Sequence, residues 1–137
     1  RSTLFPYTTL FRSPYSVETA NFEDFYSRAA PVPNLQLGQI NSIEDGVQIF
    51  FLAQLGNEVK SLAPLLSASI ADLRKSNPKL RTYTMPGKVH TVLTRPDFYT
   101  AKVDEVTLTQ WLDDLVNGRK AANVGDSLFV AGADRLQ

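Results

Sequence analysis

The chain has 137 residues, of which 43% are hydrophobic, and its 14 Lys and Arg residues balance 14 Asp and Glu residues. This length allows one domain at most, and the zero net charge argues against nucleic acid or an anionic membrane as a partner bound through bulk electrostatics. There is no cysteine and a single histidine, His90, which excludes disulfides, thiolate metal sites and multi-histidine metal sites.

Residues 1–13, RSTLFPYTTLFRS, do not fit a natural targeting segment or a natural strand. Their apolar runs are too short for a signal peptide, and Pro6 would restrict a strand to the edge of a sheet. All thirteen residues match, in order, the translation of a widely used sequencing adapter. We therefore expect residues 1–13 to be an adapter-derived artefact, and residues 14–137 to be the C-terminal fragment of a longer domain, read from a metagenomic DNA piece.

The first half of the remaining chain predicts three helices and one strand. Apolar side chains at i, i+3 and i+4 predict a helix over residues 18–30, which two prolines end. The stretch LQLGQIN predicts a short strand over residues 35–41. After a turn at Asp45, helical spacing of apolar residues predicts helices over 47–55 and about 59–75.

The second half predicts one strand and one helix around a loop. The strand covers residues 80–85, and a loop containing His90 follows it. A helix then follows, with Thr107 as its N-cap, Trp111 on its buried stripe and Gly118 at its end. Residues 119–137 show no clear periodicity of apolar residues, so no element is predicted there. We also expect the Phe50 and Phe51 pair to lie in the core.

Strands that alternate with helices predict the α/β class, with a parallel sheet and crossover helices. Two strands are too few to make a stable sheet alone, so we expect one edge of a larger sheet that is incomplete as a domain. No stretch reaches 18 uncharged apolar residues, and a membrane span is therefore not expected.

Two residues are candidates for chemistry because each follows a predicted strand. Asp45 comes after the first strand and His90 after the second, and sites of open α/β sheets form at the carboxyl ends of strands. A carboxylate near an imidazole can fix its tautomer and stabilise its charged form. Two other interpretations stay open. Asp45 could act solely as the cap of the next helix, and His90 could be structural, as a lone loop histidine often is. Glu44 is the rival carboxylate, and we expect it to be solvated.

The stretches GQINSIEDGVQIFF and PGKVHTVLTRPDFYTAKVDEVTLTQWLDDLVNG resemble the C-terminal part of pectin acetylesterase-like α/β-hydrolases, a group that includes Notum-type carboxylesterases. The shared features are an Asp followed closely by Val-Gln, a His-Thr-hydrophobic-Leu stretch, a Phe-Tyr pair and a Trp-containing helix, over roughly residues 20–118. The resemblance implies that His90 is the base and Asp45 the acid of a Ser-His-Asp triad. It implies no cofactor and no metal, and as substrate a small-molecule or polysaccharide acyl ester, such as an acetyl ester.

The chain departs from this family because it has no Gly-x-Ser-x-Gly nucleophile elbow. Ser42 and Ser127 do not lie between a strand and a helix with glycines on both sides, and the oxyanion loop is missing too. We therefore expect the nucleophile to lie upstream, in a parent that could be secreted or periplasmic, and the fragment alone to be inactive and prone to self-association. The alternative is a non-catalytic binding or scaffolding module of α/β type. A Gly-x-Ser-x-Gly after a strand in the upstream reading frame would decide between them.

Overall fold

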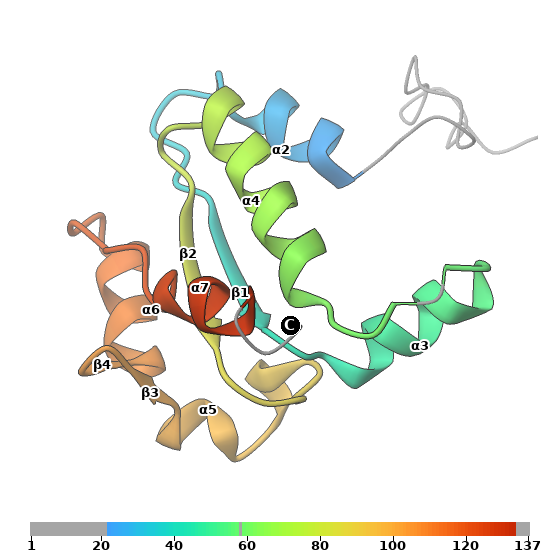
Figure 1. Cartoon of the computed structure of the whole chain (residues 1–137). Helices are drawn as coiled ribbons and strands as arrows, with labels where there is room; N and C mark the ends of the chain where they lie inside the picture. The colour runs from blue at the N-terminus through green and yellow to red at the C-terminus, as the bar shows by residue number, and fades with distance from the viewer. Residues whose placement is uncertain (1–21, 58, 134–137) are drawn as a thin grey trace, which may run out of the picture.

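The computed structural model describes residues 22–57 and 59–133, so the adapter-like segment 1–13 and the predicted start of the first helix lie outside the described residues. The described chain is a mixed α/β structure (Figure 1). Its elements are α2 (Phe22–Ala29), β1 (Gly38–Ser42), α3 (Gly46–Gln54), α4 (Ala63–Ser76), β2 (Arg81–Met85), the 3-10 turn η1 (Val92–Thr94), α5 (Asp97–Thr100), β3 (Lys102–Val103), β4 (Val106–Thr107), α6 (Leu108–Val116) and α7 (Ser127–Ala133).

The main sheet is parallel, as the alternation of strands and helices predicts. β1 pairs with β2 in a register that runs from Gly38 opposite Arg81 to Ser42 opposite Met85. On the other side of β2, Val124 forms a parallel bridge with Tyr83. Within the described residues β2 is therefore central and β1 is an edge strand. Because all these segments run the same way, their carboxyl ends lie at one edge of the sheet.

The two faces of the sheet are covered by different helices. Tyr83 faces α6, where its ring meets Trp111 edge to face at a centroid distance of 5.7 Å. Trp111 is buried, and its indole Nε1 donates to the carbonyl of Ala122 at 2.8 Å. The neighbouring Thr82 points to the opposite face, where its hydroxyl oxygen accepts from Arg74 of α4. Figure 1 accordingly shows α4 and α6 on opposite sides of the strand pair.

Several boundaries differ from the sequence prediction because tertiary contacts decide them. The first strand was expected over 35–41 but begins at Gly38 and extends to Ser42, since pairing with β2 sets its length. The predicted loop around residues 88–100 contains η1 and α5. Residues 119–137, which lack a period, contain the Val124 bridge and α7. A single bridge to a distant strand, such as that of Val124, produces no periodic pattern of apolar residues in the sequence.

A hairpin of β3 and β4 precedes α6, and it was not predicted from the sequence. Its strands are two residues each, and Asp104 and Glu105 between them have positive φ angles of 47° and 65°. Two-residue turns of this kind usually carry Gly or Asn, so the sequence had no recognisable turn signal here. The helix that follows begins as predicted, because the Thr107 hydroxyl oxygen accepts from the amide of Gln110 at 3.2 Å.

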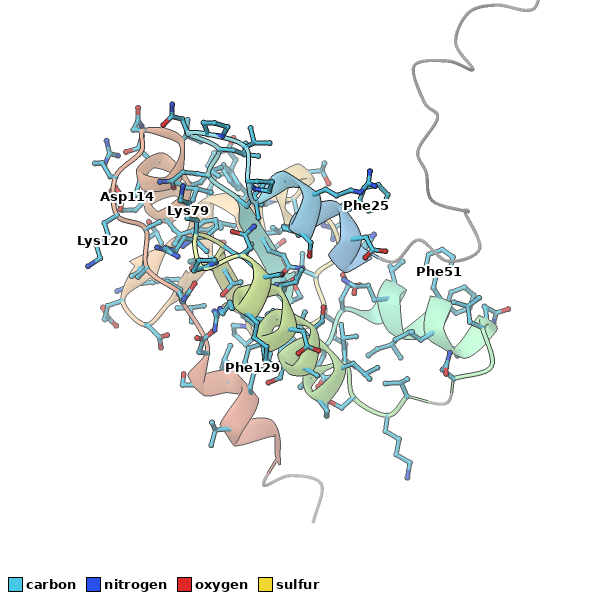
Figure 2. The ribbon with its side chains drawn as sticks, turned by 90° about the horizontal axis from the view of Figure 1, so that it is seen from above. Phe25, Phe51, Lys79, Asp114, Lys120 and Phe129 are labelled. Atoms are coloured by element: carbon cyan, nitrogen blue, oxygen red, sulfur yellow. The ribbon has the colours of Figure 1, made fainter. Side chains whose placement is uncertain are left out.

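The expectation that Phe50 and Phe51 lie in the core is wrong. The two residues are 57% and 60% exposed, and their rings contact each other edge to face. Helix α3 has no fully buried residue, and Figure 1 shows it projecting from the end of β1. Figure 2 shows the Phe51 side chain on this helix, which stands apart from the rest of the described chain. The apolar pattern predicted the helix correctly, but no described segment covers this face.

None of the helices in the described part of the chain combines the length and the apolar character that crossing a bilayer requires.

Candidate active site

The segments that follow β1 and β2 stay paired beyond the ends of the strands. The amide of Ile43 donates to the carbonyl of Met85 at 2.9 Å, and the amide of Glu44 donates to the carbonyl of Gly87 at 3.1 Å. These two bonds continue the parallel register toward the carboxyl edge of the sheet. They bring Asp45, at the start of α3, next to the loop that carries His90.

The predicted contact between Asp45 and His90 is present. Oδ2 of Asp45 lies 2.8 Å from Nδ1 of His90. Oδ1 of the same carboxylate accepts from the backbone amides of Val47 at 3.0 Å and Gln48 at 3.1 Å, which caps helix α3. Asp45 thus caps the helix with one oxygen and contacts the imidazole with the other, so the two interpretations of the sequence are compatible.

Four hydrogen bonds fill the acceptor sites of the Asp45 carboxylate. Besides the three bonds above, Oδ2 accepts from Nε2 of the Gln48 side chain at 3.2 Å. Burial by itself would raise the pKa of Asp45, but the bonds from His90 and Gln48 outweigh it and hold that pKa below its ordinary value. The carboxylate is therefore ionised at neutral pH.

An ionised carboxylate can only accept hydrogen bonds. Nδ1 of His90 must therefore be the donor in the contact with Asp45. When the imidazole is neutral, its lone pair lies on Nε2, and the ring can take a proton there. The carboxylate is buried, with a side chain 5% exposed, whereas the His90 side chain is 41% exposed. The pair thus joins a buried charge to an accessible base.

His90 and Asp45 line a hollow of about 930 Å³ that runs along the whole of β1. Most of its wall is apolar and comes from α3, α4, α6 and the His90 loop. These apolar side chains are Phe51, Leu52, Leu55, Leu62, Leu65, Leu66, Val89, Val92, Leu93, Trp111, Leu112 and Leu115. The hollow can receive an apolar group with its polar end at the Asp45 and His90 pair.

Thr91, the residue after His90, has a strained backbone that the sequence did not reveal. Its φ and ψ angles are 52° and 55°, in the left-handed region, which a β-branched residue rarely adopts. The Thr91 hydroxyl donates to the carbonyl of His90 at 2.7 Å. Strain of this kind is concentrated at functional sites, and here it turns the chain directly after the imidazole.

Glu44 is not the solvated rival that the sequence suggested. Its carboxylate is half-buried and accepts from the Ser61 hydroxyl at 2.6 Å and from the amide of Leu62 at 3.4 Å. These bonds tie the segment after β1 to the start of α4. Glu44 therefore has a structural role, and the carboxylate that contacts His90 is that of Asp45.

The described residues supply no evident nucleophile for this pair. Ser42 lines the hollow, yet the hydrogen bond of the His90 ring within residues 22–57 and 59–133 is to Asp45 and not to this serine. Ser127 begins α7, which packs against α4. The same residues contain no group of three His, Cys, Asp or Glu side chains able to hold a metal ion.

Neither a family model, nor a curated protein, nor a solved structure matches this chain. The resemblance to pectin acetylesterase-like hydrolases therefore depends on the motifs quoted above. The role of Asp45 and His90 in catalysis stays a prediction.

Proposed function

We propose that Asp45 and His90 are the orienting carboxylate and the general base of a Ser-His-Asp carboxylic-ester hydrolase of the α/β-hydrolase type. The observation that carries this proposal is the 2.8 Å contact between Asp45 Oδ2 and His90 Nδ1. In such a triad the base accepts the serine proton and later returns it to the leaving alcohol. Nε2 of His90 is the atom available for both transfers.

The surroundings of the pair favour this role. Asp45 is ionised and buried, so it stabilises the imidazolium that forms when His90 takes up a proton. Both residues follow parallel strands at the carboxyl edge of the sheet, where α/β enzymes place their sites. The order of Asp before His along the chain matches the order in α/β-hydrolases.

The serine and the oxyanion donors would come from polypeptide outside these 137 residues, because the chain has no Gly-x-Ser-x-Gly. The substrate class is an acyl ester, such as an acetyl ester, of a small molecule or a polysaccharide. The serine oxygen would attack the ester carbonyl and form an acyl-enzyme, and water would then release the acid with His90 again as the base.

The chain alone should not turn over p-nitrophenyl acetate faster than an Asp45→Ala/His90→Ala double variant. It lacks the attacking atom, and the loss of a single oxyanion donor already costs about 10²–10³ in rate. Turnover above that of the double variant that is also lost on substitution of one serine of the chain would mean that the nucleophile lies within these residues, and the assignment of the serine to other polypeptide would be wrong.

The decisive experiment uses a longer reading frame that contains this chain. A fluorophosphonate probe should label one serine outside residues 1–137, and His90→Ala should abolish both labelling and ester hydrolysis. Asp45→Asn should lower kcat by about 10⁴, as for the equivalent change in a serine protease. Asp113→Asn, at an exposed carboxylate of α6, is the matched control and should keep full activity. Hydrolysis that survives His90→Ala would refute the proposal.

A further inference from the structure

We propose that Gln48 is a positioning residue of the site: its side-chain amide holds Asp45 Oδ2 in the orientation that accepts the hydrogen bond from Nδ1–H of His90. This inference rests on the proposed function, because the orientation matters only if the pair works as acid and base. The evidence is the bond from Gln48 Nε2 to Asp45 Oδ2 at 3.2 Å, on the same oxygen that contacts His90 Nδ1 at 2.8 Å.

Ordinary helix capping does not explain this bond. Asp45 is the N-cap of α3 and Gln48 is at the third helical position, the spacing of a capping box. In a capping box the side chain at the third position reaches back to the backbone amide of the cap residue. Here the amide of Asp45 instead donates to the carbonyl of Ser42 at 3.3 Å. The Gln48 side chain is thereby free to donate to the carboxylate.

The two oxygens of Asp45 have different roles: Oδ1 caps helix α3 and Oδ2 contacts His90. Gln48 donates a hydrogen bond to each of them. Its backbone amide helps to fix Oδ1, and its side chain helps to fix Oδ2. Without the side-chain bond, Oδ2 would keep His90 as its single protein partner and would have a free acceptor site. Gln48, Asp45 and His90 all line the hollow, so water could then take that site and compete for the carboxylate.

The test uses nitrogen-15 NMR of the imidazole in the 137-residue chain. His90 is the single histidine, so its ring resonances need no assignment. At a pH where the ring is neutral, the wild type should show the Nδ1–H tautomer and a downfield Nδ1 proton. Gln48→Met, which keeps the length and helix propensity but has no donor, should raise the Nε2–H fraction and weaken the Nδ1 proton signal.

Two further variants separate the loss of the bond from Gln48 to Asp45 from a general effect on the fold. Gln48→Asn keeps the amide but is one methylene shorter, and it should behave like Gln48→Met because it no longer reaches Oδ2. Gln54→Met changes an exposed residue at the far end of the same helix and should leave the tautomer unchanged. Circular dichroism shows that each variant is folded.

The outcomes separate the two proposals. If the wild type itself lacks the Nδ1–H tautomer, the Asp45 and His90 pair does not work as proposed. If the wild type has that tautomer and both Gln48 variants keep it, with or without a loss of thermal stability, then Gln48 is only a capping residue and the present inference is wrong.

Discussion

The carboxylate of Asp45 contacts the imidazole of His90 at 2.8 Å while its other oxygen caps helix α3. One side chain thereby connects the start of a helix to a loop 45 residues further along the chain. Changes at this position are expected to affect both the stability of the protein and the state of the imidazole, and suitable variants separate the two effects.

Asp45→Ala should lower the free energy of unfolding by about 1–2 kcal/mol, because it removes the helix cap. Asp45→Asn should cost less, since Asn caps helices about as well as Asp. Both variants should remove the preference of His90 for the Nδ1–H tautomer, because neither leaves a carboxylate beside it. Urea denaturation measures the first effect and NMR the second. A full Nδ1–H preference in Asp45→Asn would contradict the assigned contact.

Acid should weaken the fold through Asp45. Burial acts to raise its pKa, but the bonds from His90 and Gln48 outweigh burial and place the folded-state pKa below the ordinary value of 3.8. A carboxyl with a depressed pKa adds stability that is fully present above its unfolded pKa and is lost as pH falls through the folded value. The stability gap between wild type and Asp45→Asn should therefore shrink below about pH 4. Denaturation curves at several pH values test this, and a gap that is constant with pH would contradict it.

The strain at Thr91 predicts opposite effects for two substitutions. Thr91→Asn should raise the free energy of unfolding by up to about 1 kcal/mol, because Asn tolerates the left-handed conformation and its side-chain NH2 group is a donor in place of the lost hydroxyl. Thr91→Val keeps the β-branched strain and loses the hydroxyl bond to the His90 carbonyl, so it should lower stability by about 1 kcal/mol. Thermal unfolding of both variants is the measurement, and effects of the same sign would argue against the strained geometry.

Gly125 and Gly56 are a matched pair for a test of close packing. Both have left-handed φ angles, 80° and 81°. A Cβ atom at Gly125 would lie 1.9 Å from the carbonyl oxygen of Thr84, whereas a Cβ atom at Gly56 would have no heavy atom within 4 Å. Gly56→Ala should cost about 1 kcal/mol for the backbone alone, and Gly125→Ala about 3 kcal/mol or more. Equal costs would mean that the Val124 segment does not lie against β2 as described.

The open edge of β1 and the uncovered face of α3 predict self-association. β1 has a single strand partner among the described residues, and Phe51 and Leu55 beside it are 60% and 77% exposed. Unpaired edges and apolar patches favour pairing between chains. Light scattering after size exclusion should show a mass that rises with concentration. Phe51→Lys should reduce this rise, whereas Val116→Lys, at an exposed residue of α6, should not.

Much of the local structure could be predicted because its causes lie close together in the sequence. Asp45 at the start of an apolar helical pattern predicts a cap, and Thr107 before Trp111 predicts another. The burial of Trp111 follows from its place on an apolar stripe. The parallel sheet follows from strands that alternate with helices.

The sequence by itself therefore determined helices α3, α4 and α6, the caps at Asp45 and Thr107, and the choice of Asp45 and His90 as candidate residues. The tertiary structure decided what depends on distant partners: the pairing that carries Asp45 to His90, the Val124 bridge, and the exposure of Phe51. The physical reason is that apolar periodicity shows which face of an element is suited to burial, but only the packed fold decides whether another segment covers that face. For the same reason, a carboxylate and an imidazole 45 residues apart become a pair only when the strand register places them together.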